Sequence, residues 1–305
     1  MTTDKPSPDI HAAIDAVCVG FMLLLFFIGA ANPAGVQDWP SAERNLVIAA
    51  ALYCAASAGL RLLPEGLGST WALTATVTLL LSFLFQAVAG FQHVFIRGWM
   101  DGSMIAWERS ATGTESTVFL QRFTSPPVTE WLMFAYVIYV PLLPVTALLC
   151  HRRDGPAGAR DFLFNLALTN VACFAGFILF PVAGPLFYDP GQYSVPLTGG
   201  FFTWCARVLH ATSHYPGGSL PSPHCAATTI MIVMLYRHNR KMFYVALPTL
   251  ISVYAATVYG RYHYAWDSLA GIVTALIVLK VSPEMAKSFV PEARRGKSLI
   301  VRQPE

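Results

Sequence analysis

Long apolar runs, separated by short polar segments, make up most of this 305-residue chain. A helix needs about 20 apolar residues to cross the hydrocarbon core of a bilayer. Eight runs are candidates for such helices, and the second and sixth are short: 17–31, 46–60, 71–95, 131–150, 162–182, 223–236, 243–259 and 266–281. The pattern predicts an all-α fold, a polytopic membrane helix bundle.

Composition agrees with this class. Hydrophobic residues make up 55% of the chain and charged residues 12%, whereas soluble domains carry about 25% charged residues. This excludes a soluble globular protein and a disordered chain, and the net charge of +3 is too small to indicate a nucleic-acid partner. The six cysteines form no CxxC pair, so neither a disulfide scaffold nor a zinc site is predicted. Cys205 and Cys225 are either a pair or two unpaired apolar residues.

Basic residues set the expected orientation. If the N-terminus is inside and the chain crosses eight times, 14 of the 20 Lys and Arg residues fall inside. Both termini are therefore predicted to be cytoplasmic. The first run could also be a cleaved signal peptide, but three acidic residues accompany Lys5 before it, which favours a retained helix. Two outer segments are long: 98–128, an interfacial helix or a solvated loop, and 183–222, a loop rich in Gly, Pro, Tyr and His.

The sequence Gly217-Gly218-Ser219-Leu220-Pro221-Ser222-Pro223-His224 precedes the sixth run. Ser222 suits a helix N-cap and Pro223 the first helical position. A helix N-terminus offers free N–H groups to an anion such as phosphate, with Gly218, Ser219 and Ser222 as candidate binding residues. His224, in the first turn, is a candidate proton donor or acceptor. His210 and His214, in the preceding loop, are candidate contacts to a head group or surface residues.

The sequence Gly260-Arg261-Tyr262-His263-Tyr264-Ala265-Trp266-Asp267 opens the eighth run. His263 and Asp267 are four residues apart, so on a helix they share one face. A carboxylate there can hold one imidazole nitrogen and leave the other as a nucleophile. Arg261 adds a positive charge suited to phosphate oxygens. Each residue alone also has a structural interpretation, as a cap, an interfacial side chain or a helix-surface pair. The topology places both clusters at the outer face.

These motifs resemble the type 2 phosphatidic acid phosphatase superfamily, which includes vanadium haloperoxidases. That family carries Pro-Ser-x-His, here Pro221-Ser222-Pro223-His224, and His-x-x-x-Asp, here His263 to Asp267. The resemblance covers 71–281. It implies an N-terminal addition at 1–70 with two extra spans, a six-span phosphatase or phosphotransferase core at 71–281, and a cytoplasmic tail at 282–305.

The chain departs from the family pattern at two places. The first motif, Lys-x6-Arg-Pro, is absent, and Phe180-Pro181 stands at the equivalent position. The Ser-Arg pair before the nucleophilic histidine is absent too, and Ala256-Thr257 stands there. Whether Arg261 replaces these arginines stays open. The departures look most like the inositol phosphorylceramide synthase branch, which moves a phosphorylated head group between lipids.

The resemblance implies a metal-independent reaction without a cofactor. His263 attacks phosphorus, Asp267 orients His263, and His224 protonates the leaving alkoxide and then activates water or an alcohol. The substrate is expected to be a phosphorylated lipid in the bilayer, reached from the periplasmic or extracytoplasmic side, in the inner membrane if the host is bacterial. A lipid phosphate, a polyprenyl diphosphate and a phosphoinositol-type donor all fit. The alternatives are a membrane transporter and an inactive relative that only binds lipid.

Overall fold

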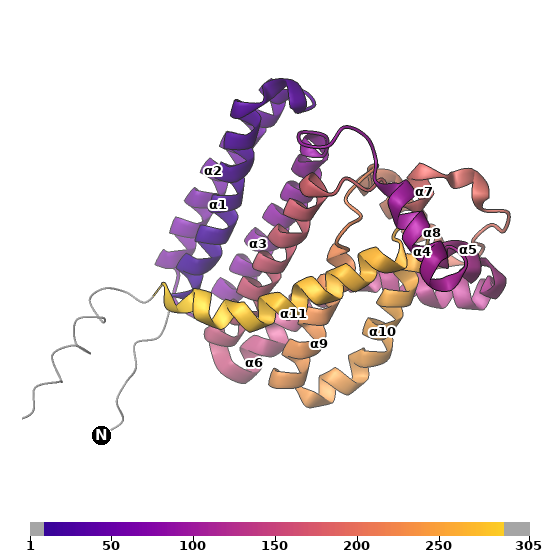
Figure 1. Cartoon of the computed structure of the whole chain (residues 1–305). Helices are drawn as coiled ribbons and strands as arrows, with labels where there is room; N and C mark the ends of the chain where they lie inside the picture. The colour runs from indigo at the N-terminus through magenta and orange to yellow at the C-terminus, as the bar shows by residue number, and fades with distance from the viewer. Residues whose placement is uncertain (1–8, 290–305) are drawn as a thin grey trace, which may run out of the picture.

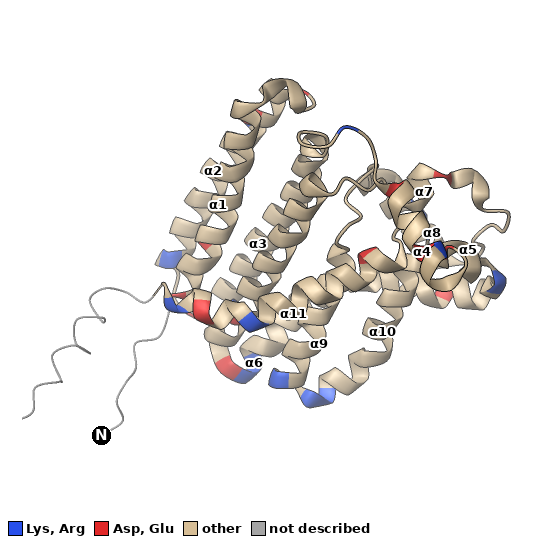
Figure 2. Ribbon diagram, viewed as in Figure 1, with Lys and Arg blue, Asp and Glu red and all other residues tan. Residues whose placement is uncertain are grey.

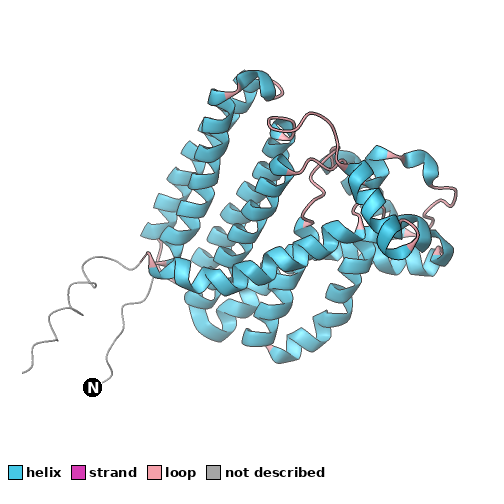
Figure 3. Ribbon diagram, viewed as in Figure 1, coloured by secondary structure: helices cyan, strands magenta, loops and turns pink. Residues whose placement is uncertain are grey.

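The computed structural model describes residues 9–289, and every regular element in them is helical (Figures 1 and 3). The α-helices are α1 (Ile10–Ala31), α2 (Trp39–Leu62), α3 (Leu67–Ala87), α4 (Asp101–Thr112), α5 (Ser116–Leu120), α6 (Pro126–Leu179), α7 (Pro185–Tyr188), α8 (Phe201–Ser213), α9 (Pro223–His238), α10 (Arg240–Tyr259) and α11 (Ala265–Lys287). Short 3-10 turns are η1 (Pro33–Gly35), η2 (Val88–Phe91), η3 (Gln121–Phe123) and η4 (Pro190–Gln192). The all-α prediction is confirmed.

Helix α6 is the centre of the bundle and packs against α1, α3, α8, α9, α10 and α11. It contains the expected fourth and fifth spans as two halves. They meet at a kink where Asp154 and Gly155 leave the helical conformation, Gly155 with a φ of 65°. Glycine adopts such left-handed angles at little cost, and the following Pro156 is suited to the first turn of the second half.

Six of the described helices are long and apolar enough to cross a membrane: α1, α2, α3 with η2, α6, α10 and α11. The sequence predicted eight spans. The difference arises because the two expected spans of α6 form one 54-residue helix, and because α9 has only 16 residues. The short second run is a full-length helix, since α2 has 24 residues. Two of the six, α1 and α2, are N-terminal, as expected.

Helices α1 and α2 form a hairpin that packs on α3 and α6. Asp15 on α1 accepts hydrogen bonds from Tyr53 (2.9 Å), Ser57 (2.8 Å) and Arg61 (2.8 Å) on α2. An acidic side chain inside an apolar helix therefore has local partners and holds the hairpin together.

The two ends of the bundle differ in their content of basic residues. Lys and Arg gather around the kink of α6, the α9–α10 turn and the far ends of α2 and α11 (Figure 2). The first residues of α9 and α11 lie at the opposite end, beside α4 and α8 (Figure 1). The two motif clusters thus lie at one end of the bundle, away from its basic end.

Both long outer segments contain helices. Segment 98–128 holds α4 and α5, and segment 183–222 holds the 13-residue α8, which the sequence pattern did not predict. The carboxylate of Glu130, at the start of α6, caps α8. It accepts the amides of Gly200 (2.6 Å) and Phe202 (2.7 Å) and the hydroxyl of Thr203 (2.8 Å). A local sequence motif cannot predict a helix cap that comes from a distant part of the chain.

The expected tail at 282–305 begins as helix, because α11 continues to Lys287. The rest of that tail, 290–305, and Lys5 in the N-terminal segment lie outside the described residues.

Candidate active site

The start of α9 has the predicted cap. Ser222 is the N-cap, its hydroxyl accepts the amide of Cys225 (3.4 Å), and Pro223 is the first helical residue. The carbonyl of Ser222 accepts the amide of Ala226 (3.0 Å). Pro223 has no N–H, so within the described residues the first turn keeps only the amide of His224 unpartnered. The predicted anion site therefore has fewer backbone donors than an uncapped helix end offers.

His263 lies in a turn rather than on a helix, because α11 begins at Ala265. The amides of Tyr262 and His263 both donate to the carbonyl of Thr257 (3.0 and 3.1 Å). Arg261 has a φ of 68°, a left-handed conformation that is uncommon for residues with a side chain. The expectation that His263 and Asp267 share a helical face is therefore wrong in its geometry, and the turn brings the two side chains together instead.

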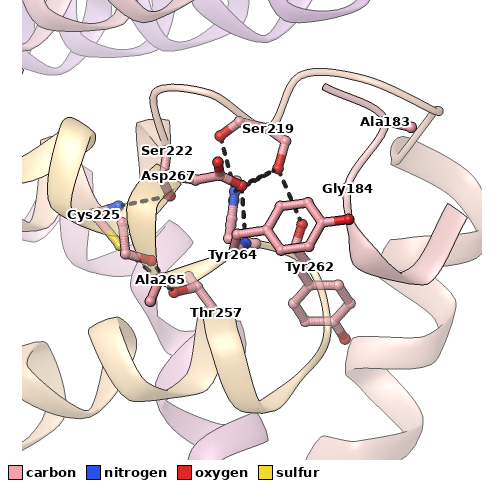
Figure 4. A network of polar contacts seen from close by, with 12 residues as sticks. Ala183, Gly184, Ser219, Ser222, Cys225, Thr257, Tyr262, Tyr264, Ala265 and Asp267 are labelled. Carbon is pink, nitrogen blue, oxygen red and sulfur yellow. Dashed lines mark hydrogen bonds and ion pairs between the residues drawn. The ribbon is translucent and has the colours of Figure 1, made fainter. Parts of the chain in front are cut away.

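Ser219 joins Asp267 to His263. Figure 4 shows Ser219 next to the carboxylate of Asp267. Its hydroxyl donates to Oδ2 of Asp267 (2.5 Å) and lies 3.2 Å from Nδ1 of His263. Oδ2 of Asp267 also accepts the amide of Tyr264 (2.9 Å), but it is 3.7 Å from Nδ1 of His263. Asp267 thus reaches His263 mainly through a serine hydroxyl. The structure brings Ser219 and Asp267 together with His263, all buried.

The hydrogen bonds of His263 define its tautomer. Nδ1 lies 3.0 Å from the carbonyl oxygen of Ser219. A carbonyl oxygen can only accept, so Nδ1 carries the hydrogen. In the neutral ring Nε2 is then unprotonated, which is the form that a nucleophilic imidazole requires.

His224 is held by aromatic rings. Its ring centroid lies 5.7 Å from that of His263, edge to face. Tyr136 of α6 stacks on it at 5.0 Å with an interplanar angle of 25°, and Tyr139 lies at 5.1 Å. Nδ1 of His224 is buried without a partner among the described residues. The rings of the two motif histidines therefore lie next to each other.

Tyr136 also links His224 to His214. The Tyr136 hydroxyl lies 2.7 Å from Nε2 of His214, and the two rings are next to each other. Burial, followed by the charges of His210 and His263, lowers the pKa of His214 to about 4. His214 is thus neutral at pH 7. Its Nδ1 donates to the carbonyl of Leu209 (3.4 Å), so Nε2 accepts from the tyrosine hydroxyl. Sequence reasoning missed Tyr136 because it lies within an apolar run.

Arg261 is buried against the loop after α7. Its guanidinium donates through Nη2 to the carbonyl of Val195 and lies 4.2 Å from the centroid of the Tyr193 ring. Burial lowers its pKa, but an arginine stays charged at neutral pH. Its Nε has no partner among the described residues, so the guanidinium keeps donor capacity for an anion.

Two cavities meet at His224. A small one of about 20 Å³, here called the histidine pocket, is lined by both motif histidines, Arg261, Gly218 and the rings of His210 and His214, together with apolar side chains. A larger one of about 540 Å³, here called the apolar cavity, lies between α3, α6 and α8. Phe85, His214 and His224 line both. A pocket lined by histidines and an arginine, next to an apolar cavity, matches an amphipathic ligand.

The loop before α9 packs closely against glycines of α6 and α11. A side chain at Gly271 of α11 would lie 2.3 Å from the carbonyl oxygen of Ser222, and one at Gly176 of α6 would lie 2.3 Å from Pro221. Only glycine permits such contact. Helices far apart in the chain therefore hold the loop that carries Ser219 and His224.

Two acidic residues of α4 accept hydrogen bonds from backbone segments next to the site. Asp101 accepts the amides of Ala183 (2.7 Å) and Gly184 (2.9 Å) and the hydroxyl of Tyr264 (3.0 Å). Glu108 accepts the amide of Ala265 (2.6 Å), at the start of α11. Both are buried, and burial raises the pKa of each carboxyl group. Sequence reasoning missed these residues because their partners are backbone groups of distant segments.

We expect Asp101→Ala to destabilise the protein by about 2–4 kcal/mol, because it leaves two buried amides without an acceptor. The melting temperature in detergent measures this. Asp189→Ala, at an exposed carboxylate in the nearby loop, is the matched control. Equal melting temperatures for the two variants would contradict the bracing role of Asp101.

The fold and the site define a polytopic helical membrane protein with a buried two-histidine centre. Comparison with protein families gives a match to the PAP2 superfamily over residues 103–281. The chain therefore belongs to the PAP2 superfamily, whose members are typically metal-independent phosphatases. No curated protein and no solved structure matches it.

Proposed function

We propose that this protein transfers a phosphoryl group from a phosphorylated lipid to water or to an alcohol, with a phosphohistidine intermediate. The observation that carries the proposal is the meeting of the histidine pocket and the apolar cavity at His224. The lipid body would occupy the apolar cavity and the phosphate the histidine pocket. The ester oxygen between them would then lie beside His224.

In the first step Nε2 of His263 attacks phosphorus, and the bond from phosphorus to the lipid oxygen breaks. Burial lowers the pKa of His224 in the free protein, and the negative charge of a bound phosphate beside it would favour its protonated form. Protonated in this way, His224 gives its proton to the leaving alkoxide, so a neutral lipid alcohol departs. Ser219 and Asp267 stabilise the positive charge that develops on the His263 ring. Arg261 and the amide of His224 would stabilise the phosphoryl oxygens.

In the second step neutral His224 takes a proton from water or from an alcohol, and the resulting oxygen attacks phosphorus. The bond from phosphorus to His263 breaks. Water gives inorganic phosphate and an alcohol gives a new phosphate ester. Because the sequence resembles the inositol phosphorylceramide synthase branch, an alcohol should be tested as acceptor as well as water.

Substrate would reach the site from the bilayer. Ser82, Gln86 and Val140 line the apolar cavity and are exposed on the side of the bundle between α3 and α6. The basic residues at the other end of the bundle favour placing that end in the cytoplasm. We therefore assign the histidine pocket to the extracytoplasmic side, with both termini cytoplasmic.

Phosphate release from short-chain phosphatidic acid by the purified protein, in detergent with EDTA, tests the proposal. We expect phosphate release that EDTA does not inhibit. If an alcohol can be the acceptor, adding a lipid alcohol should also give a new phosphorylated lipid. No turnover of any phosphorylated lipid would contradict the enzyme assignment and favour an inactive lipid-binding relative. Transport of the intact lipid across vesicles would favour a transporter.

Ser219→Ala is expected to lower kcat about 10-fold, because it removes the hydroxyl between Asp267 and His263 but leaves the carbonyl contact of His263 intact. Steady-state phosphate release measures it. Ser252→Ala is the control, because its hydroxyl accepts from the Trp131 indole and lines neither cavity, so kcat should stay at the wild-type value. A loss of kcat in Ser252→Ala that matches Ser219→Ala would contradict the role of Ser219.

A further inference from the structure

Helix α8 has an exposed aromatic face, formed by Phe201, Trp204 and Val208. Phe201 is 65% exposed and Trp204 59% exposed, and Val208, one turn later, is exposed as well. Residues at spacings i, i+3 and i+7 lie on one side of a helix. The opposite side is buried at Ala206 and continues to His210, which lines the histidine pocket. The helix therefore has the site on one side and two large uncovered rings on the other.

Ring contacts connect this aromatic face with the spanning helix α6. The ring centroid of Phe201 lies 5.2 Å from that of Phe202, which lies 5.0 Å from that of Phe134 on α6. Phe134 in turn lies 5.4 Å from Trp131, which is exposed on the surface of α6. Because α6 is long and apolar enough to cross a membrane, the aromatic face of α8 continues the surface of a spanning helix.

The two ends of α8 show its depth in the bundle. Its first turn contacts Phe134, which lies eight residues after the start of α6, or about 12 Å along that helix at 1.5 Å per residue. The carbonyl of Ser213, its last residue, accepts a hydrogen bond from the side chain of Gln86 on α3 (2.7 Å). Gln86 lies five residues before the end of the span formed by α3 and η2. Helix α8 therefore lies across the bundle at the level of the last turns of two spanning helices.

We propose that α8 is an interfacial helix, whose aromatic face contacts the lipids of the bilayer in their head-group region. Lipid surrounds the spanning helices at this level, so it is the partner that meets an exposed face there. Large aromatic rings are suited to this region, and Trp adds one N–H donor for the polar head groups. Arg207 is exposed on the same helix, and its long side chain can keep the charge in the water. An apolar face of this kind is typical of helices that lie in the plane of a membrane.

The other face of α8 gives this placement a consequence for the site. His210 and His214 line the histidine pocket, and Leu209 lines the apolar cavity. His214 accepts from the hydroxyl of Tyr136, whose ring stacks on His224. A bilayer that holds α8 in place therefore also holds the ring next to the proton donor. This consequence rests on the proposed function, whereas the placement of α8 does not.

Quenching of tryptophan fluorescence in phosphatidylcholine vesicles tests the placement. The difference between the wild type and Trp204→Phe isolates one of the seven indoles. We expect lipids brominated near the head group to lower this contribution about two-fold or more, and lipids brominated near the chain ends to lower it less. Iodide in the water should have little effect. Trp131→Phe is the matched comparison, because Trp131 is exposed on a spanning helix and should respond to bromine in the same way.

Two results would overturn the interfacial placement. If iodide quenches the Trp204 contribution and brominated lipid does not, the aromatic face is in water. If neither quenches it, protein covers the face, as in contact with a second copy of this chain.

The double variant Phe201→Gln, Trp204→Gln tests the consequence for the site. We expect kcat/KM for phosphatidic acid in vesicles to fall several-fold, and kcat/KM for the soluble p-nitrophenyl phosphate to stay at the wild-type value. Equal losses on both substrates would mean that the face only supports the fold, and would contradict the role of the bilayer. If the wild type turns over neither substrate, the proposed function is wrong, and the quenching experiment still decides where α8 lies.

Discussion

Replacing His263 with alanine is expected to reduce phosphate release from short-chain phosphatidic acid to background, a loss of at least about 10⁴-fold. The reason is that the His263 ring lines the histidine pocket and its Nε2 is unprotonated, because Nδ1 is held by the Ser219 carbonyl at 3.0 Å. Without this ring no covalent intermediate can form. Phosphate release by purified wild-type and variant protein, at equal concentration in detergent, measures the effect.

His93→Ala is the control for this experiment. His93 lies after η2, makes a hydrogen bond to the carbonyl of Ile96 and lines neither cavity. It should keep wild-type activity. The nucleophile assignment is wrong if His263→Ala retains more than a few per cent of the wild-type rate while its melting temperature is unchanged. Acid-labile phosphoenzyme trapped from the wild type and absent from the variant would support it independently.

Replacing His224 with alanine should lower kcat for a lipid phosphate by about 10²–10⁴-fold, which is the usual contribution of a positioned general acid–base group. The His224 ring lies 5.7 Å from that of His263 and lines both cavities, where the leaving oxygen would lie. The loss should depend on the leaving group. An aryl phosphate such as p-nitrophenyl phosphate releases a stable anion, so its first step needs no proton.

Stopped-flow measurement of p-nitrophenolate release separates the two steps. His224→Ala should give a burst of up to one equivalent followed by slow turnover, because phosphorylation of His263 survives but activation of water does not. His263→Ala should give no burst. Losses of equal size on the lipid phosphate and on the aryl phosphate, with no burst, would contradict the proton-transfer role and indicate that His224 only shapes the pocket.

The N-cap at Ser222 and the helix after it were predictable from the sequence, because capping depends on residues within one turn. The placement of His263 was not. A spacing of four suggested a helical face, but Arg261 adopts a left-handed conformation and the helix begins only at Ala265. Two carboxylates accept amides at the start of this helix: Asp267 accepts the Tyr264 amide locally, and Glu108 accepts the Ala265 amide from another segment.

The sequence by itself determined the class of protein, the helical bundle and the two histidine motifs, because apolar run length, capping and short motifs are local properties. It also indicated that both motifs lie at one end. Only the tertiary structure decided that Ser219 joins Asp267 to His263, that Tyr136 stacks on His224, and that His224 lines an apolar cavity between distant helices. These features depend on side chains brought together from distant helices, and no local pattern records such contacts.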